Sequence, residues 1–263
     1  MDAIKEIEYP FFLIPISPKE ISIPFKLDLE FETERFLVKT VKTQTELRQA
    51  LTLRHDVFFK NLPHKQNLSR MDQDEYDFDS DHLIVIEKKS KKIIGNYRIR
   101  SCLFHDRFYS ESEFQIQDFL KNKSGSVLEV GRACVDPDFR SGVVIQLLWR
   151  GLTSYMKQTG ARYLFGCTSI SVHIPFLIEN VWKIINEKNL LNKEFSVKPI
   201  ISYDFKEIKN APFEMPSLLG AYLKAGAQIL GAPAYDAEFE CADFLTLLDT
   251  ESLTSNQFNR FFR

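Results

Sequence analysis

Cysteines are few in this 263-residue sequence, and their spacing forms no metal-binding or disulfide motif. The four cysteines, Cys102, Cys134, Cys167 and Cys241, lie far apart, with no CxxC pair and no histidine at ligand spacing. A zinc site or a disulfide framework is therefore poorly supported, and we expect no bound metal. A reducing cytoplasm is the simplest compartment for such a chain.

An excess of charge, a membrane-spanning run and an export signal are lacking as well. The 34 Lys and Arg residues nearly balance the 36 Asp and Glu residues, so no overall field draws the chain onto nucleic acid or an anionic membrane. No run of about 18 apolar residues occurs, which excludes a transmembrane helix by length. The first residues are acidic at Asp2, Glu6 and Glu8, whereas an export signal begins with Lys or Arg. We expect a protein that is soluble or at most peripheral to a membrane.

The composition suits one large domain. Hydrophobic residues make up 44% of the chain, enough to bury a sizeable core, and no internal repeat or low-complexity linker divides it. Prolines and alternating charges near the start favour an extended arm over residues 1–34 that includes at most one edge strand. We expect a single domain over residues 35–250 and a C-terminal tail over 251–263.

Hydrophobic periodicity and turn residues predict a mixed α/β fold around one sheet. Strands are expected at 36–41, 82–86, 93–101, 127–135, 163–167, 228–230 and 243–248. Helices are expected after a cap at Thr43 or Thr45, and at 142–159, 174–186 and 217–227. Gly160 stands where the cap of the second helix belongs. Between 171 and 215 the signals are weak, and the boundaries there are the least certain.

An acidic segment at 72–81 places six carboxylates in ten residues, directly before an expected strand. Such a density of like charge destabilises a fold unless cations neutralise it, and Arg54, Arg98 and Arg100 stand in positions that could do so. The alternative is a solvated acidic turn.

A second candidate site interrupts an otherwise apolar strand with Glu129 and Arg132. Burying either charge alone costs several kcal/mol, so a partner or a function must account for both. In a regular strand the two side chains would face opposite sides of the sheet. Gly131 lies between them and predicts a β-bulge that turns both toward one cleft. The alternative is a buried structural ion pair.

A third candidate is the turn Arg140-Ser141-Gly142 at the start of the helix expected at 142–159. Backbone N–H groups at a helix start bind phosphate, and Arg140 could add a charged contact. A plain turn is the alternative here. Phe58 and the other 22 phenylalanines could line an acyl-chain pocket, although aromatic residues at helical spacing usually belong to a core.

Taken together, these stretches resemble the ornithine-acyl carrier protein N-acyltransferase family across about residues 36–250. The resemblance is carried by residues 53–58, 72–83, 95–98, 128–135 (Leu-Glu-Val-Gly-Arg-Ala-Cys-Val), 147–151, 163–167, 216–236 and 242–249. That family has a fold similar to the Gcn5-related N-acetyltransferases (GNAT) and is distantly related to acyl-homoserine-lactone synthases. The resemblance implies a GNAT-like fold with a bulged central strand and helices on both faces of the sheet.

The resemblance also implies a reaction, in which a fatty acyl group, commonly 3-hydroxylated, moves from acyl carrier protein to the α-amino group of ornithine. This is the first step of ornithine lipid biosynthesis. No cofactor or metal is implied, because the acyl-phosphopantetheine of the carrier protein is the donor. Coenzyme A-dependent relatives carry several glycines at the helix start, where this chain has only Gly142. A weakened phosphate cradle suits a carrier-borne thioester better than free coenzyme A.

Residue roles follow from the same resemblance. Glu129 and Arg132 are implied as catalytic residues, with Glu129 accepting the proton of the amine directly or through water. The implied substrate-binding residues are Arg54, Phe58, Asp74, Asp77 and Arg98. The turn at the expected helix start, rather than the resemblance, assigns Arg140, Ser141 and Gly142 to the phosphopantetheine phosphate. Asp74 and Asp77 could pair with the side-chain ammonium of ornithine.

The implied partners are acyl carrier protein, an amino acid and a separate O-acyltransferase that acts on the product, with no nucleic acid. A cytoplasmic location is expected. Transient contact with the inner membrane stays open, because the apolar stretch 9–25 could either touch a membrane or pack on its own domain. Two alternative functions also stay open. One is an N-acyl amino acid synthase that uses another amine, such as lysine or glycine, and the other is a catalytically silent module that binds an acyl carrier or lipid.

Overall fold

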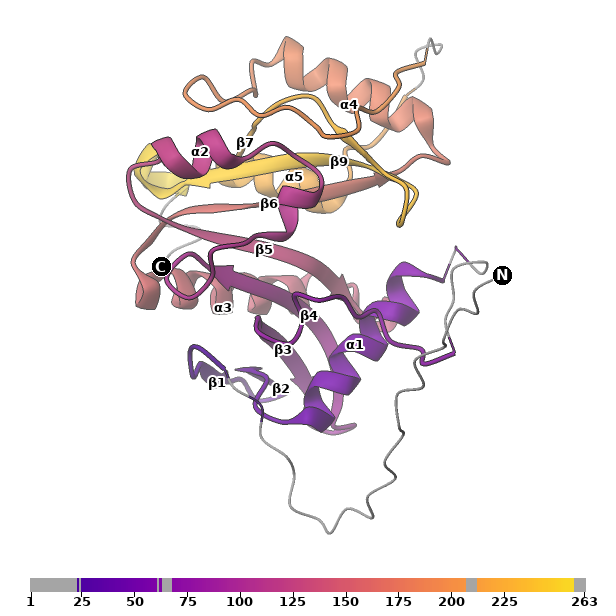
Figure 1. The fold of residues 1–263 in the computed structure, drawn as a ribbon. Coiled ribbons are helices and arrows are strands. Elements are labelled where there is room, and N and C mark those ends of the chain that lie inside the picture. Colours follow the sequence, from indigo (N-terminus) through magenta and orange to yellow (C-terminus); the bar gives the residue numbers. More distant parts are fainter. Residues whose placement is uncertain (1–22, 24, 61, 63–67, 207–211, 258–263) are drawn as a thin grey trace, which may run out of the picture.

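The computed structural model describes residues 23, 25–60, 62, 68–206 and 212–257 (Figure 1). The strands are β1 (Glu30–Glu32), β2 (Phe36–Thr40), β3 (Asp81–Glu87), β4 (Lys92–Ser101), β5 (Ser126–Val135), β6 (Ala161–Ser171), β7 (Gln228–Ile229), β8 (Ala234–Asp236) and β9 (Cys241–Asp249). The helices are α1 (Gln44–Phe58), α2 (Gln117–Asn122), α3 (Val143–Thr159), α4 (Pro175–Glu187) and α5 (Ser217–Ala225), with short 3₁₀ turns η2 (Tyr109–Ser112), η3 (Pro137–Phe139) and η4 (Thr250–Ser252). Among these residues no helix is both long and apolar enough to cross a bilayer.

All described strands belong to one sheet, in the order β1-β2-β3-β4-β5-β6-β9-β7, with β8 pairing to β9. Neighbouring strands run antiparallel except β5 and β6, which run parallel at the centre and are connected through α3. The β5–β6 pairing ends at Glu129 and Phe165, although β5 continues along β4 and β6 continues along β9. The two central strands therefore diverge from that point.

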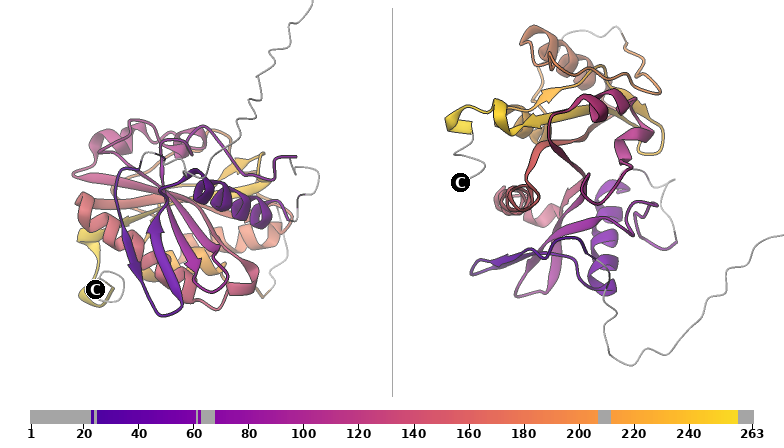
Figure 2. Two further views of the ribbon diagram at one scale, coloured as in Figure 1. Left: turned by 90° about the horizontal axis from the view of Figure 1, so that it is seen from below. Right: turned by 60° about the vertical axis from the view of Figure 1, so that its left-hand side comes forward.

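Helices cover both faces of this sheet, as the fold class predicts. On one face α3 and α5 pack with buried side chains of the central strands, including Leu128, Leu164 and Leu248. On the other face α1 lies over β4 and β5, and Phe119 of α2 packs with Phe165. The right-hand view of Figure 2 shows α3 and α1 on opposite sides of the sheet. The α/β fold with a covered mixed sheet is confirmed.

Local signals placed two helix ends correctly. The Thr43 hydroxyl accepts a hydrogen bond from the Glu46 amide at 3.2 Å, which caps α1. Gly160 ends α3 in the left-handed conformation with φ of 61°. The sequence did not predict η2, α2 or β8, because elements of three to six residues are too short to show periodicity.

The described part of the expected arm packs on the domain. β1 pairs with β2, and Leu29 is only 3% exposed. The Asp81 carboxylate accepts hydrogen bonds from the amides of Lys26 at 2.7 Å and Leu27 at 3.0 Å. Most of the apolar stretch 9–25 lies outside the described residues.

Candidate active site

A cavity of about 310 Å³ opens where β5 and β6 diverge. Its walls come from α1, β4, η2, β5, β6, α5 and the β8–β9 turn. Charges of both signs line it, because Arg98, Arg100 and Arg132 share the walls with Glu129, Asp236 and Asp243. A cavity that carries charges of both signs between splayed central strands can therefore receive a zwitterionic molecule.

The expected bulge in β5 is confirmed, one residue beyond the expected position. On one side of the bulge Asn96 of β4 pairs with Cys134, and on the other Arg98 pairs with Gly131. One residue of β4, Tyr97, therefore lies opposite two residues of β5, Arg132 and Ala133. Arg132 itself takes the left-handed conformation, with φ of 51°. This conformation is costly for a non-glycine residue. The strained residue thus brings its guanidinium to the cavity that Glu129 also lines.

Glu129 is 4% exposed and fixed by η2. Its carboxylate accepts hydrogen bonds from the Tyr109 amide at 2.8 Å, the Ser110 amide at 2.7 Å and the Ser110 hydroxyl at 2.6 Å. A carboxylate offers about four lone-pair positions, so these donors hold its orientation without using its full capacity. Glu129 is therefore a rigidly placed acceptor at the cavity wall.

The Arg132 guanidinium packs against two aromatic rings. Its central carbon is 4.6 Å from the Tyr109 ring centroid and 4.5 Å from that of Phe239. It also contacts Asp74 at 2.9 Å and Asp72 at 3.4 Å. Burial by itself lowers the pKa of Arg132, but the carboxylates outweigh burial and raise it above its ordinary value. The site therefore holds a permanent positive charge in a fixed plane.

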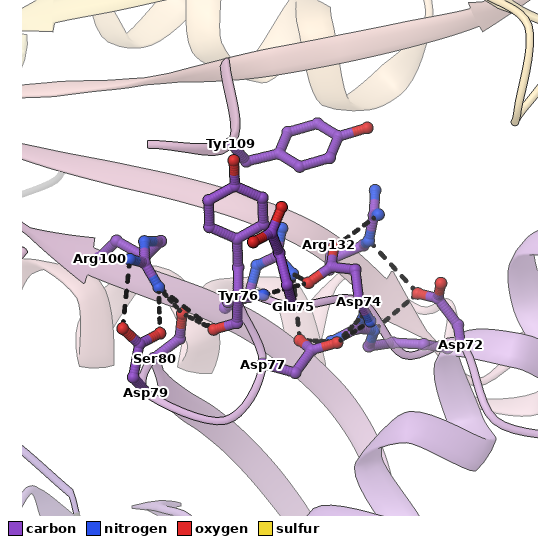
Figure 3. A network of polar contacts seen from close by, with 12 residues as sticks. Asp72, Asp74, Glu75, Tyr76, Asp77, Asp79, Ser80, Arg100, Tyr109 and Arg132 are labelled. Atoms are coloured by element: carbon purple, nitrogen blue, oxygen red, sulfur yellow. Dashed lines mark hydrogen bonds and ion pairs between the residues drawn. The ribbon is translucent and has the colours of Figure 1, made fainter. Parts of the chain in front are cut away.

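Behind Arg132 the acidic segment forms a compact ion-pair network, part of which Figure 3 shows. Arg54, fully buried, binds Asp72 at 2.8 Å and both oxygens of Asp77 at 2.5 and 3.1 Å. Arg98 binds Asp74 at 2.5 Å and Asp77 at 3.1 Å. Burial raises the pKa of Asp77, yet the two arginines dominate and hold it well below its ordinary range.

The expected arginines therefore do meet the acidic segment. Arg100 completes the set by pairing with Asp79 and by donating to the Ser80 hydroxyl at 2.9 Å (Figure 3). The segment is a structured scaffold for Arg132 rather than a solvated turn.

Comparisons with known proteins agree with this architecture. Residues 53–150 match the family model described as "Acetyltransferase (GNAT) domain". The chain is 27% identical over 244 residues to the L-ornithine N(alpha)-acyltransferase of Brucella abortus (strain 2308), covering 83% of this chain and 85% of that protein. It is 26% identical over 241 residues to the protein of the same name from Agrobacterium fabrum (strain C58 / ATCC 33970), covering 82% and 81%. The resemblance in the sequence motifs is confirmed: the chain is a homologue of the L-ornithine N(alpha)-acyltransferases.

A solved structure supports the same fold. The crystal structure of the AHL synthase LasI superposes with a TM-score of 0.51 at 13% identity, covering 88% of this chain and 96% of that chain. Together with the matched domain, these likenesses identify the homologue as an acyltransferase with a GNAT-like fold.

In this acyltransferase homologue, the predicted site residues divide into three groups. The structure brings Glu129, Arg132, Phe58 and Arg98 together at the cavity. The second group lies in the ion-pair network and does not line the cavity: Arg54, Asp74 and Asp77. The third group lies at the start of α3: Arg140, Ser141 and Gly142.

This division bears on the expected pairing of Asp77 with a substrate ammonium. The Asp77 side chain has no exposed surface, and Arg54 occupies both of its oxygens. Asp74 contacts both Arg98 and Arg132. The arrangement favours a role for both aspartates in positioning arginines, and leaves the ammonium to other carboxylates.

Sequence reasoning missed the opposite wall of the cavity, formed by Asp236 of β8 and Asp243 of β9. They are 4% and 2% exposed, and burial raises the pKa of Asp243 to about 6. Their oxygens and the Cys241 sulfur lie within 4.8 Å of one another, a spacing that suits an organic cation and could also hold a metal ion. The available signal was an acid within the apolar stretch 241–248, the same pattern that identified Glu129.

Proposed function

We propose that this chain is an N-acyltransferase that moves a fatty acyl group from the thioester of acyl carrier protein to the α-amino group of ornithine. The observation that carries the proposal is the cavity between β5 and β6, where Glu129 and Arg132 lie together in a homologue of L-ornithine N(alpha)-acyltransferases. A thioester is already activated. The protein must therefore align the amine, accept its proton and stabilise the oxyanion.

Arg132 is the proposed ligand of the amino-acid carboxylate. Its guanidinium keeps its charge and is held in one plane by Tyr109 and Phe239, which suits a planar carboxylate. Asp72 and Asp74 keep it in place from behind, and Arg54 and Arg98 in turn hold these acids. The network therefore positions one cationic substrate ligand.

Glu129 is the proposed proton acceptor, directly or through a water molecule. An α-ammonium has an ordinary pKa of about 8, so it must lose a proton before its nitrogen attacks the thioester carbonyl. Glu129 takes this first proton; the nitrogen then attacks the carbonyl, the C–S bond breaks as the amide bond forms, and the second proton of the nitrogen passes to the departing thiolate, which leaves as the thiol. The β5 bulge takes Arg132 and Ala133 out of the regular strand ladder, and backbone N–H groups there are the proposed oxyanion donors.

The start of α3 is the proposed contact for the phosphopantetheine phosphate, through Arg140, Ser141 and Gly142. Gly142 precedes the helix with φ of 91°, and no side chain caps the first turn. Uncapped N–H groups at a helix start attract phosphate. A single glycine in this turn favours the one phosphate of a carrier-bound arm over a nucleotide. The acylated amino acid would pass to a separate O-acyltransferase.

The test is a donor and acceptor matrix with the purified full chain. Acyl- and 3-hydroxyacyl-carrier protein and the matching acyl-coenzyme A are each offered with ornithine, lysine, glycine and no amine, while free thiol and N-acyl product are measured. We expect carrier protein with ornithine to give the highest kcat/KM. Faster acylation of glycine would assign the chain to another N-acyl amino acid synthase, and carrier binding without thiol release would indicate a silent module.

A further inference from the structure

We propose that Asp236 and Asp243 form the specificity site of this cavity and bind the side-chain ammonium of the acceptor. The inference rests on the proposed function, because it assumes an amino-acid acceptor in the cavity. It assigns the choice of a diamino acid to the β8–β9 wall rather than to the acidic segment before β3.

The two carboxylates carry buried charge without an ion pair in the described part of the chain. Asp236 and Asp243 are almost fully buried, yet among the described residues neither forms an ion pair with Lys, Arg or His. By contrast, Asp72, Asp74 and Asp77 each contact at least one arginine. A buried carboxylate without a cation is unfavourable. A ligand ammonium would supply the missing charge.

Both aspartates line the same cavity as Arg132 and Glu129. The Asp236 carboxylate accepts hydrogen bonds from the amides of Glu238 at 2.7 Å and Phe239 at 3.1 Å, and the Phe239 ring packs on Arg132. The β8–β9 turn thus connects the anionic wall to the cation that would bind the carboxylate. An acceptor with a carboxylate at one end and an ammonium at the other complements both walls.

Neutral donors hold the Asp243 carboxylate in place. Among the described residues, the Asp243 carboxylate accepts hydrogen bonds from two neutral side chains, the Cys241 thiol of β9 at 3.6 Å and the Ser169 hydroxyl of β6. Burial, followed by the nearby Asp236 carboxylate, raises the pKa of Asp243 to about 6; Arg132 acts in the opposite direction but does not offset the lost hydration. At pH 7.5 Asp243 is nonetheless mostly ionised, and an ammonium can pair with it.

The experiment compares ornithine with norvaline, which has the same carbon chain without the δ-ammonium, in the wild-type chain and in Asp236→Asn and Asp243→Asn. We expect kcat/KM for ornithine to fall roughly 100-fold, as when one partner of a buried charge pair is removed, and kcat/KM for norvaline to change less than about threefold. Asp249→Asn is the matched control, because Asp249 lies at the far end of β9 and pairs with Arg162 outside the cavity. Its ornithine preference should equal that of the wild type.

Thermal unfolding separates this role from a structural one. Because the folded pKa of Asp243 is raised, its ionised form costs stability above about pH 6. Asp243→Asn should therefore melt at the same temperature as the wild type or higher at pH 7.5. Melting well below the wild type would overturn the proposal for Asp243, since it would show a stabilising structural carboxylate.

The remaining outcomes also decide the question. An unchanged ornithine-to-norvaline ratio in both variants would overturn the specificity site while leaving the proposed function intact. Failure of the wild type to acylate ornithine with any donor would instead overturn the proposed function. Loss of wild-type activity with EDTA, together with metal that co-purifies with the wild type and is absent from both variants, would replace the ammonium by a metal ion.

Discussion

At the residue scale, charge balance distinguishes scaffold from substrate-facing carboxylates. Asp72 and Asp77 are buried and contact arginines, so their charges are neutralised within the protein. Asp243 is equally buried and lines a cavity without such a partner among the described residues. Burial without compensation is tolerated where a ligand supplies the opposite charge. Whether a buried acid has an arginine partner therefore indicates its role better than whether it lies near other acids in the sequence.

Glu129→Gln is expected to lower kcat by about 100-fold or more, because an amide cannot accept the proton of the attacking amine. The Gln oxygen can still accept from Ser110, whereas its NH₂ group would face the Tyr109 amide, so a modest loss of stability is also expected. Thiol release from acyl-carrier protein measures the kinetic effect, and thermal melting measures the stability.

Ser110→Ala is the matched control for Glu129, since it removes one donor to the carboxylate and leaves the carboxylate in place. Its kcat should stay within about tenfold of the wild type. If Ser110→Ala and Glu129→Gln reduce kcat equally, Glu129 acts by holding η2 and not by accepting a proton.

Asp77→Asn is expected to destabilise the fold by about 3 kcal/mol or more, because it removes a charge that balances buried arginines. The pKa of Asp77 is lowered in the folded state, so its stabilising contribution is present above its unfolded pKa of about 4 and is lost as the pH falls below that value. Urea unfolding from pH 7 to pH 3 measures this: the variant should lose much less stability than the wild type on acidification.

The control for this prediction is Asp79→Asn, because the Asp79 side chain is 54% exposed and its pair with Arg100 is partly solvated. Such a pair contributes less than about 1 kcal/mol. Equal destabilisation by Asp77→Asn and Asp79→Asn would contradict the importance of burial in this network.

At the scale of elements, local chemistry predicted most of the sheet and several helix ends. Thr43 and Gly160 cap helices through interactions that are visible in the sequence itself. The bulge in β5 was predicted from Gly131, yet Arg132 takes the left-handed conformation. The left-handed conformation favours glycine at this position, but the contacts of the Arg132 guanidinium with Asp74 and the two aromatic rings outweigh that backbone preference. Sequence patterns cannot report such contacts.

Two glycines beside the splayed strands make an element-scale prediction. A Cβ at Gly166 would overlap the Val130 carbonyl oxygen of β5, whereas a Cβ at Gly131 would meet no atom within 4 Å. Gly166→Ala should therefore destabilise the fold by at least ~1 kcal/mol as β5 and β6 are forced apart, and Gly131→Ala should change stability by less than about 0.5 kcal/mol. Denaturant unfolding checks both variants, and similar stabilities would contradict the close approach of these strands.

At the scale of the whole molecule, the cavity collects residues from distant parts of the chain. Phe58 comes from α1, Glu129 from β5 and Asp243 from β9. Local patterns could identify Glu129 as an unusual residue, but not that Asp243 would share its cavity. The resemblance to an acyltransferase family supplied part of that arrangement, and the opposite wall emerged only from the pairing of β9 with β6 and of β8 with β9.

Removing the N-terminal segment tests where the domain begins. A chain that starts at residue 35 lacks β1 and the buried Leu29. In that chain the Asp81 carboxylate still accepts a hydrogen bond from the Tyr155 hydroxyl at 2.8 Å, but it loses the hydrogen bonds from the amides of Lys26 and Leu27. Burial already raises the pKa of Asp81, so fewer donors make its ionised form still less favourable. We expect this chain to be about 2–4 kcal/mol less stable than one that starts at residue 23. Urea unfolding at pH 7 measures the difference. Equal stability would place the domain boundary at residue 35, whereas the expected loss would place it before Lys26.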